Sequence, residues 1–204
     1  MVPTKRPVGR PRKFDDAVEL ALILDAAYAA LRDQGRDFTV AHILATAGVS
    51  TRSFYRHFAS KDALLCAMYL RDARWAAGRL MKRLAGATSA IEAVEWWIDE
   101  IFGFVNDPRR AERVTVLGSI AGSRTEGAAA IAVDARRLLV EPLRVAITAG
   151  ARAGALTAED PGTASELIAA AVLHAAGLAG PYQPIAPRAQ RTVTVFCRRA
   201  LGRP

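Results

Sequence analysis

The sequence predicts an all-α protein of about nine helices, on three observations. Apolar residues recur at spacings of three and four along most of the chain, and no stretch shows the sustained alternation of a strand. Capping side chains or glycines stand at the ends of these periodic segments. Because 51% of the 204 residues are apolar, the chain has enough apolar side chains to build a sizeable core.

The first helix is expected over 15–34, and Gly35 ends it. Thr39 can then cap a short helix, which Gly48 can end in the left-handed conformation. A second short helix over 51–57 turns Phe54 inward. Its outward face is expected to carry Thr51, Arg52, Ser53, Tyr55, Arg56 and His57. Two short helices joined by a tight turn form a helix-turn-helix, whose second helix enters the major groove of DNA; an ordinary helical hairpin is the alternative.

The segment GVSTRSFYRHFASKDALL resembles the DNA-binding signature of the TetR family of transcriptional regulators. The resemblance covers residues 20–70. Tyr55, His57, Phe58 and Lys61 occupy the places where that family ends its recognition helix and opens the next helix. The resemblance implies that Tyr55, His57, Lys61 and Thr39 contact phosphates. The chain departs from some family members at Ala41, where they carry a long polar base reader.

Arg52 is the expected base reader, because a guanidinium can bridge O6 and N7 of guanine, a contact worth roughly 1–3 kcal/mol of discrimination. Thr51 and Ser53 are short enough to meet base edges.

The net charge of +8 is concentrated in a basic arm over 1–14, which is expected to be disordered. Its Arg10 and Arg12 resemble the core of an AT-hook and are expected in the minor groove or on the backbone; a solvated tail is the alternative.

Beyond the helix-turn-helix, the sequence predicts six further helices and a division into three parts. A long helix over 60–84 precedes a capped helix over 90–106 and another that begins at Pro108. The next helix, over 126–153, is expected to kink or break near Pro142. Helices over 161–178 and 188–201 complete the chain. The three parts are the arm, a DNA-binding domain over 15–61, and a domain over 62–204 for ligand binding and dimerisation.

The resemblance implies a ligand-gated switch with an apolar pocket in the C-terminal domain. Aromatic and apolar side chains on the helices over 60–84 and 90–106 are the candidates for its lining, with one histidine as a polar anchor; ordinary core packing is the alternative. The candidates are Met68, Trp75, Trp97, Ile101, Phe104 and His174.

The alanine-rich helix near 167–178 and the last helix are expected to form a two-fold interface, since small residues let helices approach closely. The expected interface residues are Leu167, Ala170, Ala171, Val193 and Phe196. Packing within one chain is the alternative. A two-fold dimer also matches the symmetry of a palindromic operator.

Other classes of protein are disfavoured by what the chain contains. The most apolar run is too short to span a bilayer, and no secretory signal opens the sequence, so a cytoplasmic protein is expected. The two cysteines are expected to be free and buried, and no metal or cofactor site is predicted. The three histidines are far apart in the sequence, without a nucleophile signature, so no enzyme is expected.

We therefore expect a homodimeric repressor that a small, apolar effector releases from double-stranded DNA; an architectural DNA binder without a ligand is the alternative.

Overall fold

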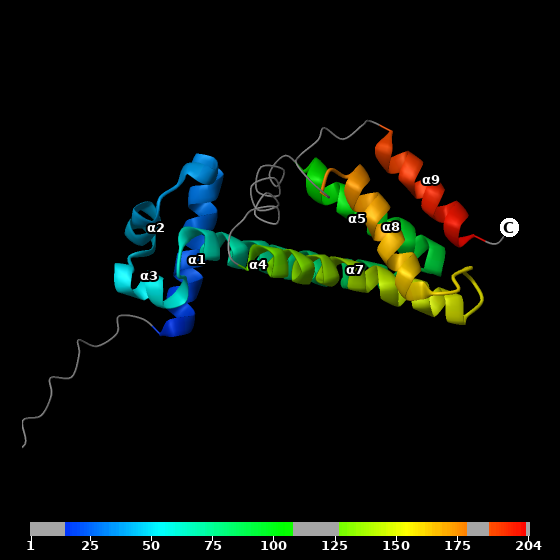
Figure 1. Ribbon diagram of the computed structural model, residues 1–204, viewed down its shortest axis with the longest axis horizontal. Coiled ribbons are helices and arrows are strands. Elements are labelled where there is room, and N and C mark those ends of the chain that lie inside the picture. The colour runs from blue at the N-terminus through cyan, green and yellow to red at the C-terminus, as the bar shows by residue number, and fades with distance from the viewer. Residues whose placement is uncertain (1–14, 108–126, 179–187, 203–204) are drawn as a thin grey trace, which may run out of the picture. The chain divides into compact units, whose positions relative to one another are not determined.

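The computed structural model describes residues 15–107, 127–178 and 188–202, and within these ranges its regular structure is helical, without a strand. The predicted all-α class is therefore confirmed. The helices, shown in Figure 1, are α1 (Asp16–Gln34), the 3-10 helix η1 (Gly35–Asp37), α2 (Val40–Ala47), α3 (Thr51–His57), α4 (Lys61–Leu84), α5 (Ala90–Asn106), α7 (Ala128–Arg152), α8 (Pro161–Ala175) and α9 (Ala189–Leu201). The arm over 1–14 and the helix expected from Pro108 lie outside the described residues.

The chain divides into two compact units between Ser60 and Lys61, and Lys61 is the first residue of α4. In the first unit, α1 packs against α2 and α3. The core between these helices is made of fully or almost fully buried apolar side chains: Ile23, Leu31, Phe38, Ile43 and Phe54. We call residues 15–60 the reading unit and the described residues from Lys61 onward the helical unit.

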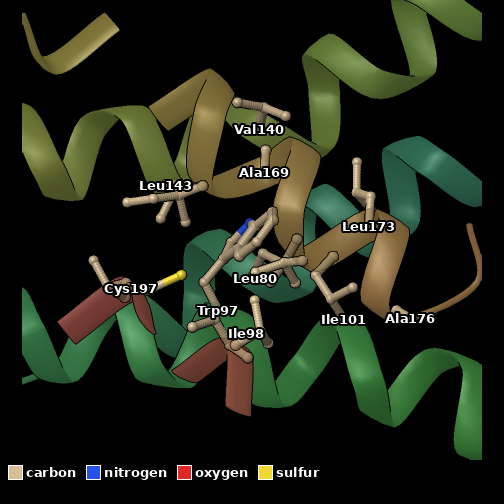
Figure 2. Close-up of a cluster of buried hydrophobic side chains, with 14 of the residues drawn as sticks. Leu80, Trp97, Ile98, Ile101, Val140, Leu143, Ala169, Leu173, Ala176 and Cys197 are labelled. Carbon is tan, nitrogen blue, oxygen red and sulfur yellow. The ribbon is translucent and has the colours of Figure 1, made fainter. Parts of the chain in front are cut away.

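The second unit is built around Trp97 of α5, which is fully buried. Figure 2 shows its indole ring surrounded by side chains from several helices, among them Leu80, Leu143 and Ala169. The indole Nε1 donates a hydrogen bond to the backbone carbonyl of Leu139, at 2.9 Å, so its polar atom is satisfied inside the core. Trp97 thereby joins α5 to α7, while α7 also lies along α4 and packs against α8.

The sequence predicted a kink or a break near Pro142; helix α7 runs through Pro142 without a break. A proline removes one backbone N–H and crowds the preceding turn, which costs about 3 kcal/mol in an isolated helix. Here Pro142 and Leu143 are buried, and packing against α4, α5 and α8 supports the helix on both sides of the proline. No described helix is both long enough and apolar enough to cross a membrane.

Candidate nucleic-acid interface

The two short helices α2 and α3 have the capping that the sequence predicts. Thr39 Oγ1 accepts a hydrogen bond from the backbone amide of His42 at 3.2 Å, and this cap begins α2. Gly48 ends α2 with φ 64° and ψ 28°, the left-handed conformation that glycine adopts without steric cost. Ser50 Oγ then accepts from the amide of Ser53 at 3.1 Å and caps α3. The helix, turn and second helix are therefore fixed by local contacts.

The outer surface of α3 carries Thr51, Arg52 and Tyr55, and all three are exposed. Tyr55 has 54% of its surface exposed, although its ring also meets the edge of the buried Phe54 ring at 5.3 Å. A phenol, a guanidinium and a hydroxyl thus project from one short helix. These groups can donate hydrogen bonds to phosphates and to base edges, the two kinds of contact that DNA reading requires.

Ser53 and His57 do not lie on this surface, so the sequence-based assignment of both to the outward face is wrong. Ser53 is buried, with 8% of its surface exposed, and its hydroxyl donates to Glu19 Oε1 of α1 at 3.3 Å. The His57 side chain is 13% exposed, and its Nε2 lies 3.6 Å from Glu19 Oε2. The physical reason is a buried carboxylate on α1 that draws polar side chains of α3 inward.

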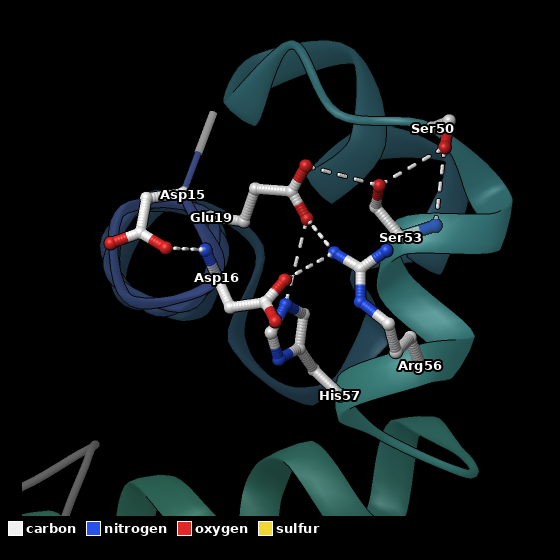
Figure 3. A network of polar contacts seen from close by, with 7 residues as sticks. All are labelled: Asp15, Asp16, Glu19, Ser50, Ser53, Arg56 and His57. Carbon is white, nitrogen blue, oxygen red and sulfur yellow. Dashed lines mark hydrogen bonds and ion pairs between the residues drawn. The ribbon is translucent and has the colours of Figure 1, made fainter. Parts of the chain in front are cut away.

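Glu19 is the centre of a polar cluster between α1 and α3, drawn in Figure 3. Its Oε2 accepts a hydrogen bond from the Arg56 guanidinium, which also lies 3.0 Å from Asp16 Oδ1. Ser53, bound to Oε1, also receives a hydrogen bond at 3.2 Å from the hydroxyl of the capping residue Ser50. We call Asp16, Glu19, Ser50, Ser53, Arg56 and His57 the Glu19 cluster.

Three members of this cluster could in principle hold a metal ion, since ligand atoms of Asp16, Glu19 and His57 lie within 4.8 Å of one another. Arg56 already contacts both carboxylates. Its guanidinium supplies the positive charge that the carboxylates require, and a cation at this place would have to displace it. The chemistry of the cluster is therefore that of an ion pair with hydrogen bonds.

The residues predicted to line a ligand pocket are not brought together as one set. Met68, Trp97 and Ile101 are fully buried, and Phe104 is buried as well. Trp75 instead has 47% of its surface exposed, with its ring 6.1 Å from that of Phe104. His174, on α8, is exposed, and so it does not point into the core as a polar anchor would.

Two arginines of α4 bind one buried carboxylate of α5. Glu100 of α5 has 6% of its surface exposed and accepts from Arg79 at 3.0 Å and from Arg83 at 2.6 Å, both on α4. The Arg79 guanidinium also lies 5.4 Å from the Trp75 ring centroid, and Arg83 lies 5.6 Å from that of Trp96. These cations, aromatic rings and the Glu100 carboxylate tie α4 to α5.

The predicted interface residues on α8 and α9 fall into two groups. Leu167 and Phe196 are strongly exposed, at 66% and 58%, and Ala170, three residues after Leu167, is exposed as well. Val193, one turn before Phe196 on α9, is buried in the core of the helical unit. An open apolar groove of about 500 Å³ follows this surface, lined by Ala171, Ala175, Arg188, Ala189, Thr192, Val193 and Phe196.

Sequence reasoning missed two buried acids: Glu19, at the centre of the Glu19 cluster, and Glu100, which binds the two arginines of α4. For Glu19 a signal was present, because it lies four residues before Ile23 and thus on the apolar face of α1. An acid on such a face has to find a buried partner. No comparable pattern identifies the partner, which lies 37 residues along the chain at Arg56.

The family model of bacterial regulatory proteins, tetR family, matches residues 23–68. No curated protein matches the chain. Among solved structures, the reduced form of NemR from Escherichia coli is similar with a TM-score of 0.67 and 18% identity, over 91% of this chain and 98% of that chain. FadR from Bacillus subtilis, in complex with stearoyl-CoA, is similar with a TM-score of 0.69 and 15% identity, over 88% and 98%. RolR in complex with resorcinol has a TM-score of 0.68 and 17% identity, over 92% and 89%. At these identities the solved structures show that the fold is shared.

Proposed function

We propose that the chain is a TetR-like homodimeric repressor that reads a palindromic operator and leaves it when an effector binds; the match of residues 23–68 to the tetR family model and the fold shared with solved regulators support this. The observation that carries this proposal is the surface of α3. Three exposed side chains of DNA-contacting type project from a helix whose opposite side is fixed to the core of the reading unit. Such a surface suits a recognition helix in a major groove.

The exposed residues Thr51, Arg52 and Tyr55 of α3 each have a role that their chemistry supports. Arg52 reads a guanine edge through two hydrogen bonds, and Thr51 at the start of the helix contacts a neighbouring base. Tyr55 donates its hydroxyl to a phosphate. Thr39 and the N-terminal amides of α2 provide a second phosphate contact, because amides at a helix start favour an anion. Arg10, Arg12 and Lys61 add positive charge toward the backbone.

The exposed surface of α8 and α9 supports the homodimer. Large apolar side chains at Leu167, Val195 and Phe196 stand in water in the single chain, and the apolar groove runs beside them. Covering such a surface with its own copy gives the two-fold symmetry that a palindromic site requires. Two recognition helices could then enter successive major grooves about 34–36 Å apart.

The aromatic side chains of α4 and α5 support an apolar effector. FadR and RolR are solved with stearoyl-CoA and with resorcinol, respectively, so this fold accommodates apolar and aromatic molecules. In this chain, Trp75 offers partly exposed aromatic surface next to the buried ring of Phe104, with the Arg79 guanidinium beside it for an anionic group. An effector releases DNA only to the extent that it prefers a conformation in which the recognition helices are spaced differently.

The test is selection of duplex DNA from a random pool, followed by footprinting. We expect enrichment of one palindrome with half-sites about 10 base pairs apart and protection of both halves by a dimer. A library of aromatic and fatty-acyl compounds is then screened for release of the selected duplex. Failure to enrich any sequence would contradict the proposal. The close packing around Trp97 would then favour an architectural DNA binder without a ligand.

A further inference from the structure

Glu19 is a carboxylate that the fold has removed from water, with 4% of its surface exposed. Both of its oxygens are engaged by α3. Oε1 accepts from Ser53 in the first turn of that helix, at 3.3 Å, and Oε2 accepts from Arg56 in its last turn. One side chain of α1 therefore contacts both ends of the helix that carries the exposed Arg52.

Apolar packing turns one side of α3 toward the core but does not by itself set the exact rotation of the helix. Phe54 inside the helix and Phe58 at its C-terminal end are both buried, with ring centroids 5.8 Å apart. Hydrophobic contact depends on buried area and has little directional preference, so it determines how deeply the helix lies. Hydrogen bonds prefer nearly linear geometry, so the contacts of Glu19 with Ser53 and Arg56 determine which way the helix faces.

The size of this effect can be estimated from helix geometry. At the side-chain radius of roughly 6 Å, a rotation of about 10° displaces an atom by about 1 Å. Binding constellations have to be held within about 0.5 Å to keep their contacts. A small rotation of α3 is therefore enough to break a two-hydrogen-bond contact between Arg52 and a base.

We propose that Glu19 is a positioning residue for DNA reading: through Ser53 and Arg56 it sets the rotation of α3 and hence the base selectivity of Arg52. This inference rests on the proposed function, because it takes α3 as the helix that reads DNA. Glu19 does not contact DNA in this scheme. It acts through α3, and Arg56 is consequently held in the cluster rather than offered to a phosphate.

Charge and positioning predict opposite effects when the acid is neutralised. If Glu19 acted only as a negative charge near a phosphate-binding surface, Glu19→Gln would tighten binding to every DNA sequence. If Glu19 positions α3, the same change weakens binding to the selected operator while binding to a scrambled duplex stays equal or becomes tighter. The ratio of the two affinities therefore separates the explanations.

The experiment measures the dissociation constants of the full chain for the selected operator and for a scrambled duplex of equal length, over a series of salt concentrations. For Glu19→Gln we expect the operator-to-scrambled ratio to fall about tenfold, the scale of one lost base contact. The salt slope should stay unchanged, since the number of phosphate contacts is the same. Re-selection from the random pool should show relaxed preference at the base that Arg52→Ala also relaxes.

Asp33→Asn is the matched control. Asp33 lies near the end of the same helix, its side chain is 60% exposed, and it pairs with Arg32 at 3.1 Å rather than with α3. The substitution Asp33→Asn removes the same charge from α1 as Glu19→Gln does, and its operator-to-scrambled ratio should stay at the wild-type value. A Glu19→Gln protein whose ratio equals that of Asp33→Asn overturns the inference.

Folding is checked by circular dichroism at the temperature of the binding assay. Arg56 is 34% exposed and keeps Asp16 as a partner, so Glu19→Gln leaves no buried cation unpaired. If the Glu19→Gln protein is nevertheless unfolded, Glu19→Asp is measured instead. Its carboxylate is one methylene shorter and cannot hold both contacts, so the operator-to-scrambled ratio should again fall. A wild-type ratio for Glu19→Asp overturns the inference.

If wild-type protein enriches no sequence, the proposed function fails first. If it enriches an operator that the Glu19 variants read equally well, the inference about Glu19 fails alone.

Discussion

At the scale of single residues, the polar side chains of α3 fall into two groups. Thr51, Arg52 and Tyr55 point into solvent, whereas Ser53 and His57 turn toward Glu19. A helix of seven residues has too few apolar positions for its sequence to show which polar residues face inward. The division was therefore not predictable from α3 itself, because it depends on an acid in another helix.

Arg52→Ala should relax base selection at one position of each half-site and lower operator affinity by about tenfold, the usual scale for one two-hydrogen-bond base contact. Binding to scrambled DNA should change little. The measurement is a selection experiment paired with titrations against both duplexes. Arg32→Ala is the control, because it removes the same charge from a side chain that is 75% exposed on α1. Equal selectivity losses in the two variants would contradict the assignment of Arg52.

The two cysteines should be unreactive in the folded protein. Both are free and buried, and burial raises the pKa of the Cys197 thiol to about 11. Burial and the nearby Asp62 also raise the pKa of Cys66. Since the thiolate is the reactive form, iodoacetamide at pH 8 should label neither residue until the chain is unfolded. Mass spectrometry of folded and urea-treated samples checks this, and rapid labelling of Cys197 in folded protein would refute it.

At the scale of elements, the predictable features were those fixed by contacts close in sequence. Thr39 and Gly48 have the capping and helix-ending roles expected from their residue types, and α3 has the bounds predicted for it. At Pro142 the local pattern predicted a kink or a break, and α7 has no break there because neighbouring helices pack against it. The packing of other helices against this segment was not visible in its local pattern.

Gly48→Ala should destabilise the reading unit by about 1–2 kcal/mol, the cost of placing a side chain in the left-handed conformation. Gly78→Ala is the control, because its expected change in stability has the opposite sign. Gly78 lies inside α4, and a methyl group there would meet nothing within 4 Å. That variant should gain about 0.5–1 kcal/mol from lower entropy in the unfolded chain. Urea unfolding followed by circular dichroism gives both values; stabilisation by Gly48→Ala would contradict the turn geometry.

At the scale of the whole molecule, the fold was predictable because one short segment carries a specific signature, and the tetR family model matches that segment at residues 23–68. The proposed ligand site was much less predictable. Met68 and Trp97 were selected for apolar bulk, which does not distinguish a pocket from a core, and both lie fully buried. Trp75 was selected for the same reason and is half exposed. Neighbouring side chains from α4, α5 and α7 decide these outcomes, and the local sequence does not contain them.

The proposed dimer gives a prediction at the same scale. Phe196→Glu should convert the protein to a monomer and reduce operator affinity by more than tenfold, because a charge would be buried in the interface and each half-site would be bound separately. Sedimentation velocity and operator titration measure the two effects. Val133→Glu, on α7 and 67% exposed, adds the same charge outside the α8 and α9 surface and should stay dimeric. A dimeric Phe196→Glu protein would place the interface elsewhere.

The position of Trp97 also makes the chain an optical reporter of its own helical unit. All three tryptophans, Trp75, Trp96 and Trp97, lie on α4 and α5, and the reading unit has none. Emission excited at the indole band therefore comes from one unit, with Trp75 open to a soluble quencher and Trp97 shielded from it. A change in that emission when unlabelled operator is added would be a direct signal that DNA bound to one unit alters the other.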